Sequence, residues 1–298
     1  MIKYNPKSWF SLIFKFHKSD TFRRMRYVLV IFAIYSAGVV YLVLHFPDFF
    51  TFKSTIQVHS LLGFVISMLL VFRTNTAYDR WWEGRKLWGA LINDSRNMAI
   101  KINAVLAKEN IRDRSYFASM IPNYSFALKE HLRKGVDLSD LDYDNVDDFE
   151  NVRIAQHIPN AIANGMYSRL HKLYRDQVIS GDQLITLDKE LKSFTDIAGA
   201  CERIKSTPIP YSYSLFFKKV IFIYTATLPF GLVYDFKYWT VPIVFFMLYV
   251  FGSIELIAEE IEDPFGEDVN DLPTDEIALR VRVNTREILG YTAPVIHK

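Results

Sequence analysis

Long runs of uncharged residues alternate with charged stretches along this chain. The first run, Tyr27 to Phe46, has twenty residues, and the second, Ser54 to Phe72, has nineteen. Because a helix rises 1.5 Å per residue, twenty residues extend about 30 Å, the thickness of a bilayer's hydrocarbon core. The pattern therefore predicts a first pair of transmembrane helices within residues 27–72.

A second pair of apolar runs occurs near the end of the chain, at Val220 to Tyr234 and Tyr238 to Ile254. Only Asp235, Phe236 and Lys237 separate them, so we expect a tight hairpin there, and a total of four spans. Val220 to Tyr234 is short for a full crossing. Buried helices of a water-soluble helical protein are the alternative interpretation, mainly for this second pair.

Basic residues are concentrated at one end of each predicted hairpin. They are Lys15, Lys18, Arg23, Arg24 and Arg26 before the first run, Arg73, Arg80, Arg85 and Lys86 after the second, and Lys218 and Lys219 before the third. The short links at Pro47–Lys53 and Asp235–Lys237 are poor in positive charge. By the positive-inside rule, both termini and the long middle segment are predicted to be cytoplasmic.

The middle segment carries most of the charge and has little strand signal. The second transmembrane helix is expected to run on past residue 73 as one long rod, because Leu87, Leu91, Ala99 and Ile102 recur at helical spacings. Residues 113–133 and 183–203 are typical of amphipathic helices, and residues 137–148 of a solvated acidic loop.

We therefore predict an all-α fold in which membrane helices are continuous with a helical cytoplasmic layer in a single domain, 1–298. Its parts are a cytoplasmic segment (1–26), a transmembrane hairpin (27–72), a helical cytoplasmic region (73–219), a second hairpin (220–254), and an acidic turn with a C-terminal tail (255–298).

Composition excludes several classes of function. Lys and Arg number 35 and Asp and Glu 33, a net charge of +2, so no nucleic-acid partner is expected. The single cysteine, Cys201, excludes an internal disulfide. No phosphate-binding loop or hydrolase motif is present, and the seven histidines lack metal-ligand spacing, so no enzyme is predicted. His59, inside the second span, is expected to be solvated at the membrane interface.

The second span contains two patterns. Ser60, Gly63 and Ser67 place small residues along one side, which allows close helix approach. Phe64, Met68 and Phe72 recur every four residues and form a slowly turning apolar stripe. The stripe either packs against neighbouring helices or lipid, or lines a pore as a hydrophobic constriction. Ile66 is expected to face lipid.

An acidic segment follows the last span closely. Its carboxylates are Glu259, Glu260, Glu262, Asp263, Glu267, Asp268 and Asp271, and Pro264 and Gly266 interrupt the helix among them. Oxygen ligands at such a turn suit calcium. The alternative is pairing with Arg23, Arg24 or Arg26.

Three uncommon motifs occur in order along the chain: DRWWEGRKLWG at 79–89, CERIKSTPIPY at 201–211 and EDPFGEDVNDLP at 262–273. They resemble the bestrophin family, in its bacterial branch, and the likeness covers essentially the whole chain. The resemblance implies a homopentameric, passive channel for small monovalent ions, embedded in the lipid of a bacterial inner membrane, with one axial pore and no required cofactor.

Specific residues follow from the resemblance. It places three hydrophobic rings of a pore neck at Phe64, Met68 and Phe72, although the flexible Met68 departs from the usual rigid residue. The turn that clasps calcium in some members corresponds to Glu260, Asp263, Asp268 and Asp271, which implies a structural divalent cation at most. A second constriction at the cytoplasmic exit falls on Asp182, with Ile179 the next candidate; Ser180 with Asp182 is also typical of a helix N-terminus.

The permeant ion is expected to be a cation, with an anion as the alternative. The bacterial branch favours a sodium-like cation, whereas the positive edges of phenyl rings favour chloride or other anions. A secondary transporter is a rival, but it needs charge at mid-membrane depth, and the first two spans contain no Asp, Glu, Lys or Arg. A membrane-bound metal enzyme would lack a histidine or nucleophile beside the acidic turn.

Overall fold

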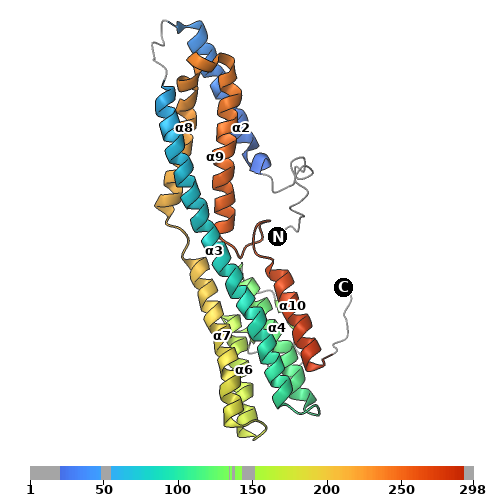
Figure 1. The fold of residues 1–298 in the computed structure, drawn as a ribbon. Coiled ribbons are helices and arrows are strands. Elements are labelled where there is room, and N and C mark those ends of the chain that lie inside the picture. Colours follow the sequence, from blue (N-terminus) through green and yellow to red (C-terminus); the bar gives the residue numbers. More distant parts are fainter. Residues whose placement is uncertain (1–20, 48–54, 134, 136–137, 143–151, 292–298) are drawn as a thin grey trace. The chain divides into compact units, whose positions relative to one another are not determined.

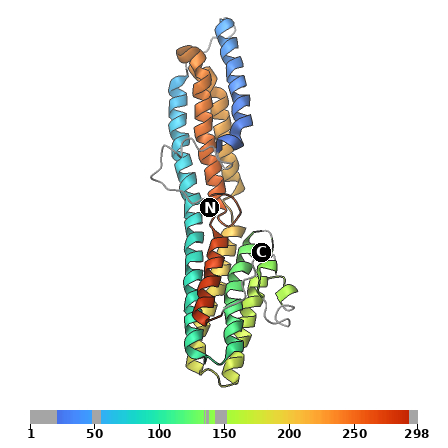
Figure 2. The ribbon, with the colours of Figure 1, turned by 90° about the vertical axis from the view of Figure 1, so that its right-hand side faces the viewer.

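The structure, a computed structural model, describes residues 21–47, 55–133, 135, 138–142 and 152–291. Every regular element among these residues is a helix, as the sequence predicts (Figures 1 and 2). The chain divides into two compact units. The first comprises Met1–Trp81, Pro208–Asp263 and Asp268–Asn270, and the second Trp82–Thr207, Pro264–Glu267 and Asp271–Lys298.

The first unit contains the apolar helices. They are α2 (Thr21–His45), the N-terminal part of α3 (Ile56–Val105), α8 (Tyr211–Phe236) and α9 (Thr240–Glu262). Among the described residues, three stretches are long and apolar enough to cross a membrane: α2, α3 and Tyr211–Glu262, which holds both α8 and α9. Helix α9 packs against both α2 and α8 (Figure 1).

The turn between α8 and α9 lies two residues later than predicted. Asp235 and Phe236 still belong to α8, and the reversal is made by the 3-10 turn η3 (Lys237–Trp239). Lys237 has a φ of 49°, a left-handed conformation that ends the helix. The hairpin is therefore confirmed, but the charge of Asp235 does not terminate α8.

Helix α3 contacts the first unit along one narrow seam. The buried positions are separated by three or four residues: His59, Gly63, Ile66, Leu70, Arg73 and Ala77. Ile66 is only 3% exposed and belongs to the core with Leu70, Phe217 and Leu248. The prediction that Ile66 faces lipid is therefore wrong.

Only one of the three small residues on α3 makes a close helix approach. A Cβ atom at Gly63 would lie 2.8 Å from the hydroxyl oxygen of Tyr224 on α8, so a larger residue there would displace the Tyr224 side chain. Ser60 and Ser67 are exposed, and the Ser67 hydroxyl donates to the Gly63 carbonyl oxygen of its own helix.

His59 was predicted to be solvated at the membrane interface, but it lies inside this packing. It is 7% exposed. Its Nε2 is 3.2 Å from the Thr227 hydroxyl on α8, and its Nδ1 is 3.0 Å from the Thr55 carbonyl oxygen. Both ring nitrogens thus have partners within the first unit.

A cluster of charged side chains lies in the same unit, next to the apolar part of the seam. The Arg73 side chain is 1% exposed; its Nη2 lies 2.7 Å from Glu262 Oε2 and its Nε 3.6 Å from Glu255 Oε2. The other Glu262 oxygen accepts the backbone N–H of Ile209 at 2.7 Å. Glu262 thereby joins α3, α9 and the segment that leads into α8.

The second unit is built from the C-terminal part of α3 with four further helices: α4 (Ile111–Leu132), α6 (Ile158–Arg175), α7 (Gly181–Ser206) and α10 (Thr274–Leu289). The long rod predicted for α3 is confirmed, since the helix continues to Val105. Helix α4 was predicted to be amphipathic, but it is buried on all sides from Tyr116 to Lys129 because α6, α7 and α10 surround it.

The sequence analysis predicted helix α10 only as part of a C-terminal tail. In the structure, ion pairs hold this helix against α4. Lys129, 4% exposed, lies 2.9 Å from Asp275 Oδ1, and Arg133 lies 2.6 Å from Asp275 Oδ2. The hydrogen bonds from Arg133, with those from Lys129, lower the pKa of Asp275 from 3.8 to about 2. This contribution to stability is present above pH 3.8 and is lost as the pH falls through about 2.

The acidic loop predicted at residues 137–148 lies mostly outside the described residues. Its described part includes the short 3-10 helix η2 (Leu138–Asp140) and Asp142. Asp140 lies 3.3 Å from Lys129, and Asp142 pairs with Arg286 of α10. These two carboxylates therefore form ion pairs that hold this segment against α4 and α10 in the second unit.

We predict that the Arg73→Met variant loses about 3–5 kcal/mol of folding stability, because the buried Glu255 and the half-buried Glu262 lose the cation between them. Thermal and denaturant unfolding of the protein in detergent micelles measure the loss. The matched control is Arg203→Met, which removes an exposed ion pair with Glu83 and should cost about 0–1 kcal/mol. Equal losses for the two variants would contradict a special role for Arg73.

Candidate functional site

The apolar stripe predicted on the second span lies on the uncovered side of α3. Phe64, Met68 and Phe72 are 68%, 53% and 52% exposed in the chain. At about 100° per residue, Phe64 and Met68 are roughly 160° around the helix from Ile66 in the buried seam. The first unit therefore directs these large side chains away from its own core.

Further apolar side chains flank this stripe on α3. Val58, Leu61, Leu62, Val65 and Val71 are each more than 40% exposed. A helix with apolar residues on all sides must be covered by lipid or by other protein. Within the described part of the chain, the other helices of the first unit bury only the seam of α3 and leave these side chains exposed.

The predicted exit residue Asp182 lies in the first turn of α7 and is exposed. Ser180 caps this helix: its hydroxyl accepts the Gln183 N–H at 3.2 Å, and the Gln183 side chain accepts the Ser180 N–H at 2.9 Å. Ser180 thus fills the capping role that was predicted for it. An acidic residue here also complements the helix dipole.

The fallback residue for the exit, Ile179, is buried at 3% exposure. It cannot face an ion pathway, because it packs within the second unit. Ile185, three residues beyond Asp182, is 71% exposed. A spacing of three places both residues on one face of α7.

The acidic segment after α9 has an arginine partner. Arg24 of α2 lies 2.6 Å from Glu260 Oε1 and 3.2 Å from Asp268 Oδ1. Glu260, 7% exposed, also accepts the Asn270 side-chain amide at 2.5 Å. The structure thus contains the arginine pairing that the sequence left as an alternative to calcium.

The remaining residues of the predicted divalent site are placed differently. Asp263 is exposed, and Asp271 belongs to the second unit, where it is buried beside Gly266. Within the described part of the chain, these carboxylates are not among the side chains whose ligand atoms converge. The geometry therefore gives the predicted metal site no support beyond its charge.

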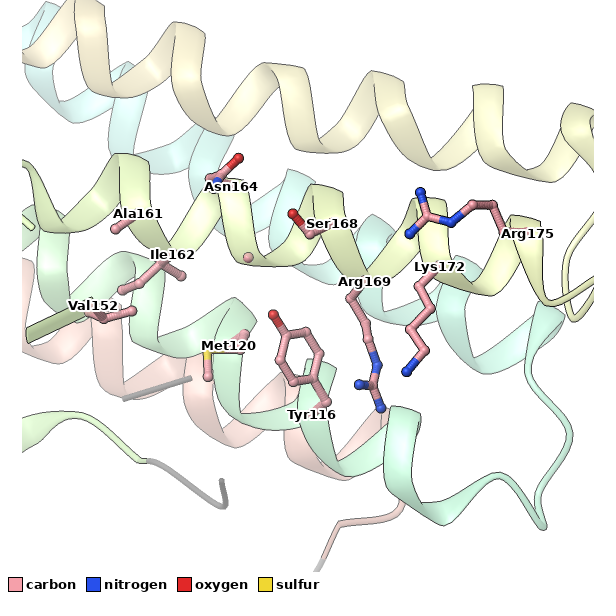
Figure 3. Close-up of a pocket in the computed structure, with 11 residues that line it drawn as sticks. Tyr116, Met120, Val152, Ala161, Ile162, Asn164, Ser168, Arg169, Lys172 and Arg175 are labelled. Carbon is pink, nitrogen blue, oxygen red and sulfur yellow. The ribbon is translucent and has the colours of Figure 1, made fainter. Parts of the chain in front are cut away.

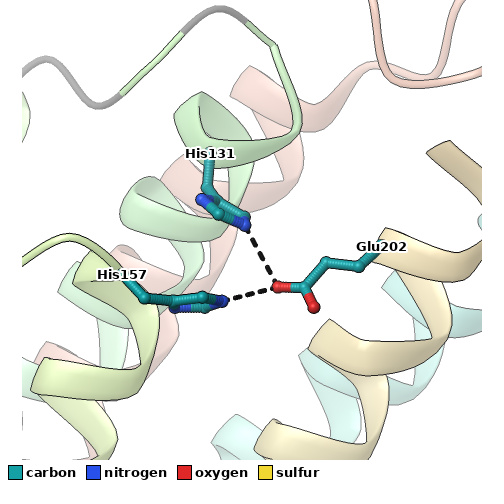
Figure 4. Close-up of side chains that lie close together, drawn as sticks. All are labelled: His131, His157 and Glu202. Carbon is teal, nitrogen blue, oxygen red and sulfur yellow. Dashed lines mark hydrogen bonds and ion pairs between the residues drawn. The ribbon is translucent and has the colours of Figure 1, made fainter. Parts of the chain in front are cut away.

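A group with metal-ligand chemistry does occur in the second unit. His131, His157 and Glu202 come from three separate segments and meet around one carboxylate oxygen (Figure 4). Sequence analysis overlooked this group because the histidines were judged by their spacing along the chain. Glu202 belongs to one of the three family motifs, and that motif is the signal that could have directed attention to it.

Cys201, next to Glu202, is fully buried. Burial, and then the charges of Glu202 and Glu83, raise the pKa of its thiol to about 12. The thiol therefore stays protonated at neutral pH and offers neither a nucleophile nor a ready metal ligand.

A basic cavity of 660 Å³ lies beside α6 in the second unit. Figure 3 shows its charged side chains, Arg169, Lys172 and Arg175, with Tyr116 on the facing α4. Arg169 is paired with Asp113, and its guanidinium lies 5.1 Å from the centroid of the Tyr116 ring. Lys172 and Arg175 are exposed, so the cavity opens to solvent on its basic side.

These observations define an all-helical membrane protein with an uncovered apolar helix face. The family described as Bacterial/Fungal Bestrophin protein matches residues 1–287. The chain belongs to this bestrophin family.

Individual relatives agree with this assignment. A voltage-dependent anion channel-forming protein of Nostoc is 34% identical, over 78% of this chain and 76% of that protein. The protein of that name from Escherichia coli K12, YneE, is 32% identical over 95% and 92%. The crystal structure of a bacterial bestrophin homologue from Klebsiella pneumoniae superposes with a TM-score of 0.83 at 27% identity, covering 90% of this chain and 100% of that one.

The names of the relatives indicate whether the permeant ion is an anion or a cation. Both sequence relatives are named as anion channels. The expectation of a sodium-like cation is therefore not supported, and the anion alternative fits these names better.

We predict that removing the arginine partner exposes the acidic segment to divalent cations. In the Arg24→Gln variant, Glu260 and Asp268 lose their shared cation, so calcium should raise the unfolding temperature more than it does for the parent protein. Titration with calcium, followed by calorimetry and thermal unfolding, measures the difference. The control is Arg23→Gln, whose residue is exposed. A calcium response equal in all three proteins would contradict competition at Arg24.

Proposed function

We propose that this protein is the subunit of a passive, homopentameric channel for small monovalent anions in a bacterial inner membrane. Residues 73–219 and both termini would be cytoplasmic. The proposal rests on the family and on one observation, the exposure of Phe64, Met68 and Phe72 on the side of α3 opposite its buried seam.

The stripe supports a neck because its side chains are large, apolar and spaced by one helical turn. Repeated around an axis, each residue forms a ring, and successive rings are about 6 Å apart. A narrow apolar section of this kind opposes ions by dewetting. Phe64 and Phe72 also present the positive edges of their rings, which suits an anion, while Met68 adds a flexible, polarizable ring between them.

The anion assignment rests on the names of the relatives and on the phenyl edges. Asp182 acts in the opposite direction, because a ring of carboxylates at a narrow exit concentrates cations. Its effect therefore adjusts selectivity and does not define it. The reversal potential in a sodium chloride gradient decides the sign, and a potential near that of sodium would overturn the anion assignment.

We predict that the triple variant Phe64→Ala, Met68→Ala, Phe72→Ala conducts more current per channel than the parent. Removing these side chains widens the neck and removes the dewetting barrier. Planar-bilayer recording of the purified oligomer measures the current, and its stepwise openings distinguish a channel from a transporter.

The matched control replaces three exposed apolar residues of α2, Val30, Ile31 and Ile34, with alanine. This variant should keep the parental conductance. An intact oligomer of the neck variant that conducts like the parent would contradict the neck assignment.

We predict that Asp182→Asn shifts the reversal potential toward the anion limit and that Asp182→Arg shifts it further. Both shifts should be larger at low salt, where charges are less screened. Asp196→Asn is the control, since Asp196 is an exposed acid on the same helix paired with Lys192. Unchanged potentials in both Asp182 variants would mean that Asp182 serves only the N-terminus of α7.

A further inference from the structure

Three side chains with metal-ligand chemistry converge in the second unit from distant parts of the chain. His131 lies in the last turn of α4, His157 is the N-cap of α6, and Glu202 lies near the end of α7. Figure 4 shows both imidazole rings turned toward the same carboxylate. The proposed conduction pathway does not account for this arrangement.

The distances are those of a compact ligand set. Glu202 Oε1 lies 3.1 Å from His131 Nε2 and 2.7 Å from His157 Nε2. All three ligand atoms lie within 4.8 Å of one another. In a tetrahedral zinc site with bonds of about 2.1 Å, adjacent ligand atoms are roughly 3.4 Å apart, so side-chain movements of about 1 Å suffice.

We propose that His131, His157 and Glu202 form a binding site for a zinc-class divalent transition metal. Two imidazole nitrogens and one carboxylate are a common zinc ligand set, which leaves a fourth position for water or another ligand. The side chains are 28%, 31% and 36% exposed, so an ion can reach them from solvent while the rest of each side chain stays packed.

The N-cap at His157 predicts a signature of metal binding. Its Nδ1 accepts the backbone N–H of Asn160 at 3.2 Å, so in the neutral ring the proton is on Nε2, facing Glu202. A metal on Nε2 needs the lone pair of that nitrogen, so the single proton of the neutral ring would have to move to Nδ1, which ends the cap hydrogen bond.

The hydrogen-bonded arrangement is also the main competing interpretation. Two imidazole N–H groups donating to one carboxylate would tie α4, α6 and α7 together without a metal. The two interpretations differ in what an added ion does. A metal site gains stability with zinc, whereas a purely hydrogen-bonded cluster does not respond.

The test uses the full chain in detergent micelles, freed of any histidine tag, with zinc chloride and cobalt chloride as probes. Calorimetry should show one zinc per chain, the unfolding temperature should rise with zinc, and bound Co²⁺ should give the visible absorption bands of a four-coordinate ion. The variants His131→Ala, His157→Asn and Glu202→Gln should each weaken zinc binding at least about 100-fold.

These variants and one control separate loss of the site from loss of the fold. Asparagine at 157 is a good N-cap, so α6 keeps its capping hydrogen bond, and glutamine at 202 keeps the shape of the side chain. His171→Ala removes an exposed histidine of α6 outside the cluster and should leave binding unchanged. No zinc heat and no thermal shift in the parent, or equal binding by parent and cluster variants, would overturn the proposal.

Discussion

A single buried guanidinium, that of Arg73, fixes how α3 sits in the first unit. It pairs with two carboxylates of α9, and Glu262 in turn accepts the Ile209 N–H and, through its carbonyl oxygen, the side chain of Arg80. Buried pairs of this kind contribute little net stability, because desolvation offsets the attraction, but breaking one is costly. The ion pairs of Arg73 fix the rotation of α3 about its axis. Because Arg73 lies in the seam, the preceding residue, Phe72, points out of the unit.

The helices of this fold were largely predictable from the sequence, but which side of α3 is buried was not. Span lengths and the continuity of α3 are local properties, visible in runs of apolar residues. Ile66 and Phe64 are equally apolar, so hydrophobicity cannot tell which of them is buried; the structure assigns 3% exposure to one and 68% to the other. Helix α10 escaped prediction for a related reason, because Lys129 and Arg133, distant in sequence, hold it on α4.

The same distinction applies to the sites. The spacing of Phe64, Met68 and Phe72 could be read from the sequence because a single helix carries all three residues, whereas their role in a neck stays a proposal. The choice between calcium and arginine at the acidic segment depended on where Arg24 lies, and the contacts with Glu260 and Asp268 join residues more than 200 positions apart. The cluster around Glu202 combines three segments, so only the fold reveals it. Function that depends on tertiary proximity is thus the part that sequence patterns miss.

Exposed apolar residues alone do not distinguish a pore-lining helix from one that faces lipid, since lipid covers an apolar surface equally well. The residues that continue the stripe do not separate the two cases by themselves, because they lie past the predicted end of the span. At about 100° per residue, Asn75 and Asp79 lie within roughly 60° of Phe64 around the axis, and both are exposed. A helix that leaves lipid and a helix that leaves a narrow neck both become polar where water begins. The axial position proposed for α3 therefore rests on the family, and the current through the neck variant is what decides it.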